Sequence, residues 1–529
     1  KMFLFIGFAV AYILYKWLTK NDDYFLKKGI PYEKPLPIVG NFLGFMLQRE
    51  TLIDVIQRKY DKFKKSKIFG LFNFNQIGYI VTDADLIKRI TIKDFDHFVN
   101  HDQNFDNVDR VFSKSLFSLH NQQWREMRTI LSPIFTSSKM KMMFGLLSNH
   151  VSDFMIHFNR KAAKDVDVYD IFSRFTADGI ATAALGFEGD CVKNENSEIF
   201  KIVKQSLADF TKFTSVLKFL LVSIAPKLYD LLGYQLVNSN VVEFLRHVTI
   251  DTMRDREENN ITRPDVIQLL LEVRKGKGQL KSKDDEVNDD ELRNFSAHQE
   301  FNVSTNKSTT SLNINDDDLW IAQTFIFFVA GFNTTSHLLQ TLTYELAKNQ
   351  EVQQELYQEI QEVVATLEGK PITYEALHKM KYLDCVISEG LRMYPPAVQS
   401  DRCCSKPIDL DLGNGKTLHV NKGEVIGLPI YNIQHDPDYF PNPETFDPTR
   451  FNDENKSSIV AGSYLPFGMG QRACIGSRFA LMESKLLVFN LLANYKIEPS
   501  SNTPDKLTFK ADLTASVKET IYLKFKARN

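Results

Sequence analysis

The chain has 529 residues, and its 64 Lys and Arg nearly balance its 66 Asp and Glu to give a net charge of −2. That balance gives no reason to expect a nucleic acid as partner, because such partners call for a strongly basic surface. The five cysteines form an odd set without regular spacing, which argues against a disulfide scaffold and a zinc site. The 41 phenylalanines predict an aromatic interior suited to apolar ligands.

The first element in chain order is an apolar run from Met2 to Tyr15, with several lysines behind it. A helix that spans a bilayer takes about 20 apolar residues, so the run is slightly short. The lysines favour a cytosolic position for the rest of the chain. A cleaved signal peptide is the alternative, but it carries its charge ahead of the apolar run. We therefore predict a membrane anchor over residues 1–28 and one large domain over residues 29–529.

The large domain shows helical patterns from residue 138 onward. Residues 210–232 are strongly apolar, which fits equally well a surface that dips into a membrane and a buried pair of helices. Residues 275–318 are rich in Lys, Asp, Asn, Ser and Thr, so we interpret them as a solvated loop inserted into the domain. Residues 319–346 then form a long apolar segment with helical spacing.

Strand patterns occupy little of the chain. Residues 77–82 predict one strand, and residues 410–425, punctuated by glycines, predict a small sheet. Residues 507–526 alternate in a similar way. We therefore predict a mainly α fold with a minor β region.

A glycine-rich loop over residues 467–476 has the pattern F-x-x-G-x-R-x-C-x-G and precedes a strongly helical segment. A helix N-terminus and the nearby Arg472 both lower the pKa of a thiol, so Cys474 is favoured as a thiolate. The glycines let the backbone approach a flat ligand, and Arg472 can pair with an anionic group on it. The alternative is a buried structural cysteine, but the complete pattern favours a metal ligand.

The middle of the long apolar segment contains the run Ala330, Gly331, Phe332, Asn333 and Thr334. Glycine costs a helix about 1 kcal/mol relative to alanine. Glycine followed by hydroxyl residues can open a kink where a ligand approaches. A helix with incidental threonines is the alternative.

Three further segments carry arginines in suggestive positions. Glu389 and Arg392 share a helix face ahead of a Pro-Pro stop, although most such pairs are solvent-exposed ion pairs that contribute little to stability. Trp124 and Arg128 are four residues apart and also share a face. Arg402 follows the proline turn, where a plain surface arginine is the alternative.

Taken in order, these segments resemble those of the cytochromes P450, the haem-thiolate monooxygenases, from about residue 31 to the C-terminus. The resemblance implies a triangular, mainly helical domain around haem b, with the Cys474 thiolate as axial ligand of the iron. Residues 29–529 would then be the cytochrome P450 catalytic domain. It also implies that Glu389, Arg392 and Arg450 form a buried network that braces the cysteine loop.

The resemblance assigns roles to the remaining site residues. Thr334 would be the hydroxyl that helps to protonate bound dioxygen. Asn333 stands where the family usually has Asp or Glu, and an amide cannot relay a proton as a carboxylate does. The residues that would contact the haem ring or its propionates are Trp124, Arg128, Ala330, Arg402, Phe467, Arg472 and Gly476.

The implied reaction inserts one oxygen atom from O2 into an apolar small molecule. The motifs look closest to insect microsomal members related to the vertebrate drug-metabolising group, so the substrate would be a xenobiotic, a plant toxin, an insecticide or a lipid-like compound. The sequence has no recognisable flavin or nicotinamide motif. Electrons would therefore come from NADPH through NADPH–cytochrome P450 reductase, with cytochrome b5 as a possible second partner, at the cytosolic face of the endoplasmic reticulum membrane.

Two surfaces and two rival activities complete the expectations. A basic surface near the cysteine would steer an acidic reductase, with ordinary solvated charges as the alternative; it comprises Arg125, Lys139, Lys141 and Arg478. The substrate pocket, with plain core packing as the alternative, would be lined by Phe325, Phe328, Val329, Phe332, Ala397, Val398 and Thr514. The rivals are a haem-thiolate isomerase or dehydratase that acts on peroxides without a reductase, and a haem-binding sensor without chemistry.

Overall fold

The computed structural model describes residues 12, 15–16, 19–74, 76–102, 109–162, 164–211, 218, 221, 226–233, 237–263, 265–275, 311–512, 514 and 516–528. Most of the predicted anchor, much of the apolar segment 210–232 and residues 276–310 of the predicted loop lie outside this set. Within it, no helix is both long and apolar enough to cross a bilayer.

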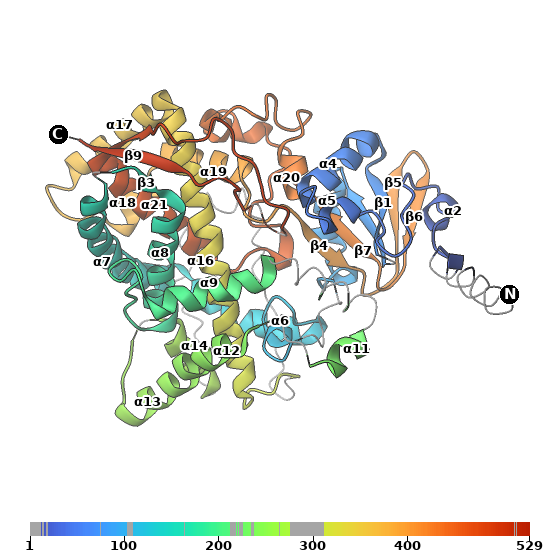
Figure 1. Ribbon diagram of the computed structural model, residues 1–529, viewed down its shortest axis with the longest axis horizontal. Helices are drawn as coiled ribbons and strands as arrows, with labels where there is room; N and C mark the ends of the chain where they lie inside the picture. Colours follow the sequence, from blue (N-terminus) through green and yellow to red (C-terminus); the bar gives the residue numbers. More distant parts are fainter. Residues whose placement is uncertain are drawn as a thin grey trace, which may run out of the picture.

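Helices dominate one side of the molecule, and the largest sheet lies on the other (Figure 1). Up to residue 275 the helices are α2 Tyr24–Lys27, α3 Leu43–Met46, α4 Leu52–Phe63, α5 Ala84–Lys88, α6 Asn121–Leu131, α7 Ser137–Lys161, α8 Val168–Ile180, α9 Glu198–Thr211, α11 Pro226–Leu231, α12 Ser239–Arg246, α13 Thr252–Asn259 and α14 Val266–Arg274. The later helices are α16 Asp317–Lys348, α17 Gln350–Thr366, α18 Tyr374–His378, α19 Lys381–Met393, α20 Ile430–Gln434 and α21 Ser477–Asn494. The predicted mainly α fold with a minor β region is confirmed.

The strands of the described residues form three small sheets. The largest has the order β1-β2-β7-β4, in which β2 and β7 are parallel and the other neighbours antiparallel. The others have the orders β3-β9-β8 and β5-β6 and are antiparallel. The strands are β1 Ile68–Asn73, β2 Gln76–Val81, β3 Val166–Asp167, β4 Ser400–Cys403, β5 Ile408–Gly413, β6 Lys416–Val420, β7 Val425–Leu428, β8 Tyr495–Pro499 and β9 Tyr522–Ala527.

The strand predictions hold in part. The strand predicted over residues 77–82 is β2, and the small sheet predicted over residues 410–425 is the β5-β6 hairpin. Of residues 507–526, only the end forms a strand, β9, while Phe509 and Val517 make an isolated bridge. Alternation alone did not distinguish a strand from an irregular hairpin in this last segment.

The central element is α16, which crosses the helical side of the molecule (Figure 1). Asp316 caps it by accepting a hydrogen bond from the backbone N–H of Asp318. Most of its side chains are buried against α8, α19 and α21. It runs uninterrupted through Gly331, and the kink that this glycine can open stays a prediction. Gly331 also permits close packing of α8, because a Cβ there would lie 2.4 Å from Cδ1 of Ile180.

Candidate functional site

The cysteine loop, residues 467–476, folds back on itself ahead of α21. The N–H of Cys474 donates to the carbonyl of Phe467 at 2.8 Å, and a 3₁₀ turn covers Gly470–Arg472 between them. Gly470 has a φ of +75°, and a Cβ there would lie 2.0 Å from the carbonyl oxygen of Thr91. Only glycine fits at this position, because both its backbone conformation and its contact exclude a side chain.

Cys474 differs from the other cysteines in its exposure. Its side chain is exposed, whereas the other four are buried. Protein nevertheless surrounds it closely enough that burial raises the pKa of its thiol, an effect that the N–H groups of Gly476 and Ser477 and the charge of Arg128 counter. An accessible thiol with protein around it faces an internal space. That position suits a metal ligand in the interior.

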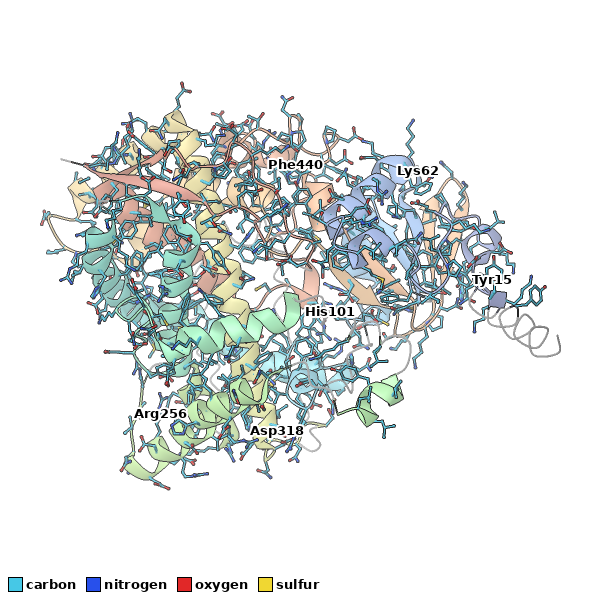
Figure 2. The ribbon with its side chains drawn as sticks, viewed as in Figure 1. Tyr15, Lys62, His101, Arg256, Asp318 and Phe440 are labelled. Carbon is cyan, nitrogen blue, oxygen red and sulfur yellow. The ribbon has the colours of Figure 1, made fainter. Side chains whose placement is uncertain are left out.

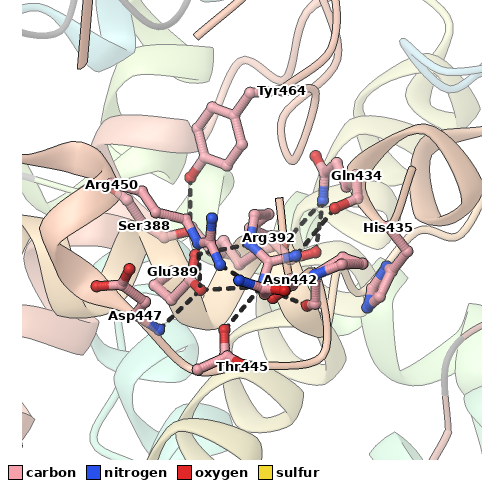
Figure 3. Close-up of polar contacts among 12 residues, drawn as sticks. Ser388, Glu389, Arg392, Gln434, His435, Asn442, Thr445, Asp447, Arg450 and Tyr464 are labelled. Carbon is pink, nitrogen blue, oxygen red and sulfur yellow. Dashed lines mark hydrogen bonds and ion pairs between the residues drawn. The ribbon is translucent and has the colours of Figure 1, made fainter. Parts of the chain in front are cut away.

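The predicted buried network on α19 is present (Figure 3). Arg392 donates from Nε and Nη2 to the two carboxylate oxygens of Glu389, at 2.7 and 2.8 Å, and both side chains are fully buried. Arg450 adds a contact from its Nε to Oε1 of Glu389 at 3.3 Å. One carboxylate is thus shared by two guanidinium groups, as the sequence predicted.

The same network reaches the cysteine loop through Gln434. Arg392 donates from Nη1 to the backbone carbonyl of Gln434 at 2.9 Å (Figure 3). The side-chain oxygen of Gln434 in turn accepts the backbone N–H of Leu465 at 2.7 Å. Since Leu465 lies two residues before Phe467, the network fixes the point where the chain enters the loop.

Arginines from three elements converge beside the loop. Arg128 lies on α6 and Arg402 on β4; both are buried, and the Nε atom of each lacks a hydrogen-bond partner among the described residues. Burial lowers the pKa of both guanidinium groups to about 10. Burial and then repulsion from Arg402 hold the pKa of Arg472 well below its usual value. Such a cluster attracts anionic groups, because clustered buried charge is costly without them.

Arg472 itself clamps the loop to a neighbouring segment. Its guanidinium carbon lies 4.1 Å from the centroid of the Trp124 ring, a cation–π distance. Its N–H groups donate at 2.7–3.2 Å to the backbone carbonyls of Val99, Leu116, Phe117 and Leu119. Most of its donors are thus engaged, so Arg128 and Arg402 are better placed than Arg472 to receive a new anionic partner.

The structure adds two residues to this cluster that the sequence did not indicate. His101 lies between the helical side and the largest sheet (Figure 2), and its Nδ1 is 3.1 Å from Oδ1 of Asp401. The other carboxylate oxygen of Asp401 accepts the backbone N–H of Asp102 at 2.6 Å. Burial lowers the pKa of His101, and Arg472 and Arg402 act in the same direction against Asp401. The only sequence signal was the position of Asp401 next to Arg402.

The middle of α16 carries two exposed positions that the sequence assigned to the site. Ala330 and Thr334 are exposed on this otherwise mostly buried helix, and residues four apart share a face. The hydroxyl of Thr334 donates to the carbonyl of Ala330 at 2.7 Å. Asn333 is half-buried and lines a separate polar cavity together with His337. The adjacent hydroxyl and amide thus face different spaces.

The predicted pocket lining is wrong for most of its apolar members. The core residues are Phe325, Phe328 and Phe332, at 1, 0 and 1 % exposure, and Val398, at 3 %. The partly exposed apolar positions of the same turns of α16 are Ile326, Phe327 and Val329. Ala397 is exposed, and Thr514 lines the polar cavity beside Asn333. Both helix faces are apolar, so the sequence did not separate them.

These residues together fit an iron porphyrin with two carboxylate groups. Cys474 offers an accessible thiol, and Phe467 and Gly476 are partly exposed beside it. Arg128 and Arg402 offer anions buried Nε atoms that have no partner in the part of the chain that the structure describes. The small side chain of Ala330 leaves room for a flat ligand.

The predicted basic surface is only partly basic. Arg125 pairs with Asp96 at 2.6 Å, and Lys141 pairs with Glu375 at 2.5 Å. Arg478 donates to a backbone carbonyl at 3.3 Å, and Lys139 is half-buried. The neighbouring carboxylates reduce the positive potential that the four side chains would otherwise create.

Comparison with known proteins agrees with this geometry. The family model described as "Cytochrome P450" matches residues 30–525. The chain is 39% identical over 512 residues to "Probable cytochrome P450 9f2" of Drosophila melanogaster, with 94% of each chain covered. It is also 39% identical over 515 residues to "Cytochrome P450 9e2" of Blattella germanica, covering 94% of this chain and 91% of the relative. To "Cytochrome P450 6k1" of the same species it is 32% identical, covering 94% and 90%.

The fold, the cysteine loop and these matches define a haem-thiolate monooxygenase. The chain belongs to the cytochrome P450 family. Membership implies a haem whose iron is bound by a cysteine thiolate.

Proposed function

We propose that this monooxygenase inserts one oxygen atom from O2 into apolar small molecules, with electrons from NADPH delivered by NADPH–cytochrome P450 reductase. The observation that carries the proposal is the accessible Cys474 thiol, which protein surrounds and on which the charge of the buried Arg128 acts. Cytochrome b5 is a second candidate donor. The sequence holds no flavin or nicotinamide motif, so the electrons require a partner.

In this proposal the Cys474 thiolate would bind the haem iron, and its electron donation would supply the chemistry that favours cleavage of the O–O bond. Arg128, Arg402 and Trp124 would hold the propionates, and Arg472 would position the loop and contribute its remaining donor. Phe467, Gly476 and Ala330 would contact the ring. The buried position of the arginines would exclude water from these ion pairs and so strengthen them.

Thr334 and Asn333 handle protons on the other side of the site. The Thr334 hydroxyl can turn from the Ala330 carbonyl toward a ligand in the site, because its side chain is exposed. Asn333 can orient water by hydrogen bonds but cannot itself release a proton. A peroxide isomerase needs no such proton relay. The amide at position 333 therefore supports peroxide isomerisation as the second candidate activity.

The proposed substrate class follows from the exposed wall of α16. Ile326, Phe327 and Val329 offer apolar surface next to Ala330, with no charged side chain among them. Foreign compounds, plant toxins, insecticides and lipid-like molecules all fit such a wall.

We also propose that residues 1–28 anchor the chain in the endoplasmic reticulum membrane and that residues 29–529 form a catalytic domain facing the cytosol. The stretch predicted over residues 275–318, of which Asp317 and Asp318 belong to α16, is proposed as a loop inserted in that domain. Exposed apolar side chains near the N-terminus and on α11 support a membrane contact. They include Leu26, Leu36, Ile38, Leu228, Leu231 and Leu232.

Reconstitution tests the proposed activity. The purified protein, reductase and NADPH are incubated with a panel of apolar compounds under ¹⁸O-labelled O2. The proposal predicts one labelled oxygen atom per product molecule and NADPH consumption that depends on the reductase. Turnover of hydroperoxides without NADPH, and no labelled product, would favour the isomerase.

A further inference from the structure

A polar cavity of about 120 Å³ lies beside α16, on the side that Asn333 faces. A water molecule occupies about 30 Å³ in the liquid, so the cavity has room for several. One wall is α16, and another is the junction of β3 and α8, where β3 pairs with β9 (Figure 1). The third wall is the segment of residues 510–520 that precedes β9.

The cavity connects the surface to the middle of α16. At its outer end it is lined by Lys510, Lys518 and Thr520, all exposed. At its inner end lie Asn333, which is half-buried, and His337, which is 5 % exposed. Water in this cavity can therefore reach Asn333, which precedes Thr334 in the sequence.

His337 is the buried imidazole at the inner end. It lies one helical turn from Asn333, and its Nδ1 is 3.5 Å from the amide nitrogen of Gln340. Its Nε2 has no hydrogen-bond partner among the described residues. Burial lowers the pKa of His337 to about 4, so the ring is neutral near pH 7 and offers one donor and one acceptor.

Other titratable groups face the same cavity. Asp167 and Tyr169 come from the β3–α8 junction, and Lys510, Lys518 and Glu519 come from the C-terminal segment. Burial raises the pKa of the Asp167 carboxyl. These groups lie in the walls opposite α16, so His337 is the titratable side chain that α16 itself presents.

The proposed reaction consumes protons at this helix. Substrate R–H, O2, two electrons from NADPH and two protons give R–OH and H2O. The protons come from solvent, and Asn333 cannot pass one on. A neutral imidazole can accept a proton at one nitrogen while it releases another, or can hold a water that does so.

We propose that His337, with Gln340, is a positioning residue that holds a chain of waters in this cavity and thereby carries protons from solvent past Asn333 to the Thr334 hydroxyl. The inference rests on the proposed monooxygenase activity. It assigns this chain a route that compensates for the amide at position 333.

The first test does not depend on turnover. Deuterium exchange at the imidazole C2 carbon is followed by mass spectrometry in the full-length, haem-loaded protein. His337 should exchange measurably in the folded protein although its side chain is only 5 % exposed, because cavity water reaches it. Complete protection of His337 from exchange in the folded protein would overturn the water route, whether or not any variant folds.

The second test compares matched variants. His337→Gln keeps a hydrogen-bonding side chain but cannot be protonated, and His150→Gln makes the same change in a second cavity of about 120 Å³ away from α16. The fraction of NADPH electrons recovered in product should fall several-fold in H337Q, with a larger solvent isotope effect, and should stay unchanged in H150Q. Equal coupling in the wild type and H337Q would contradict the proposal.

A double variant separates a proton route from a packing defect. Asn333→Asp supplies an acid at the end of the route, so N333D combined with H337Q should recover most of the lost coupling. A packing defect would persist in the double variant, and that result would overturn the proposal. If the wild type gives no NADPH-dependent product, the proposed function fails instead, and the exchange test still decides whether water reaches His337.

Discussion

At the scale of single residues, the site buries positive charge that does not by itself stabilise the folded protein. Arg128 is buried, its Nε has no partner among the described residues, and its pKa is lowered to about 10 by burial. An arginine in that state costs stability and gains its value only with an anionic ligand.

We predict that Arg128→Met leaves the stability of the haem-free protein unchanged or higher, while haem is lost faster from the loaded protein. Arg256→Met is the matched control, because Arg256 makes two hydrogen bonds to Asp265, at 2.7 and 2.6 Å (Arg256 is labelled in Figure 2). It should destabilise the protein by about 3–5 kcal/mol with little effect on haem retention. Urea unfolding and transfer of haem to an acceptor protein measure the two effects. Destabilisation of the haem-free protein by R128M would contradict this account.

The sequence predicted residues best where a motif fixes their type. Cys474 and the trio Glu389, Arg392 and Arg450 lie as predicted, because a thiol in a glycine loop and a shared carboxylate each need specific side chains. His101 and His337 were missed, because a histidine far away in sequence carries no sign of the cavity or cluster it enters. Their roles depend on tertiary contacts that no local pattern encodes.

At the scale of elements, α16 shows what a sequence pattern can predict and what it cannot. Its length was predicted closely, since a long apolar run with helical spacing needs no tertiary information. The face of α16 that stays exposed was not predicted. Apolar residues surround the helix, and the elements that pack against it decide which of those residues are covered. Gly331 has a packing reason that no local pattern indicated, the close approach of Ile180.

The brace between α19 and the cysteine loop gives a stability prediction. Arg392→Met leaves the fully buried Glu389 carboxylate with the 3.3 Å contact from Arg450 and the backbone N–H of Asp447 at 3.0 Å, so the free energy of unfolding should fall by about 3–5 kcal/mol. Arg58→Met breaks an exposed pair with Glu50 and should cost at most about 1 kcal/mol. Equal losses in chemical denaturation would show that the brace contributes no more than a surface ion pair.

At the scale of the whole molecule, buried histidines make stability depend on pH. Burial lowers the pKa of His435 to about 3, from 6.5. Below pH 6.5 the unfolded chain therefore binds a proton at His435, whereas the folded chain does not. The contribution of His435 to the free energy of unfolding is full above pH 6.5 and is lost as pH falls. Between pH 6.5 and pH 5 the loss is about 2 kcal/mol. The drop in unfolding free energy from pH 7 to pH 5 should be smaller in His435→Gln by about that amount, and an equal drop would contradict this.

The charge pattern of the molecule predicts a modest dependence of turnover on salt. Arg125 and Lys141 already pair with carboxylates, so only part of the basic surface can attract an acidic reductase. Reductase-supported turnover should fall as ionic strength rises, and Arg125→Gln should weaken that dependence. Turnover that does not change with salt would count against electrostatic steering.

The measurement that tests the central claim most directly is the carbon-monoxide difference spectrum of the dithionite-reduced protein. Ligation of the haem iron by the Cys474 thiolate predicts a strongly red-shifted Soret band, which Cys474→Ser should abolish. A band at the position typical of imidazole-ligated haem in the unaltered protein would contradict the account.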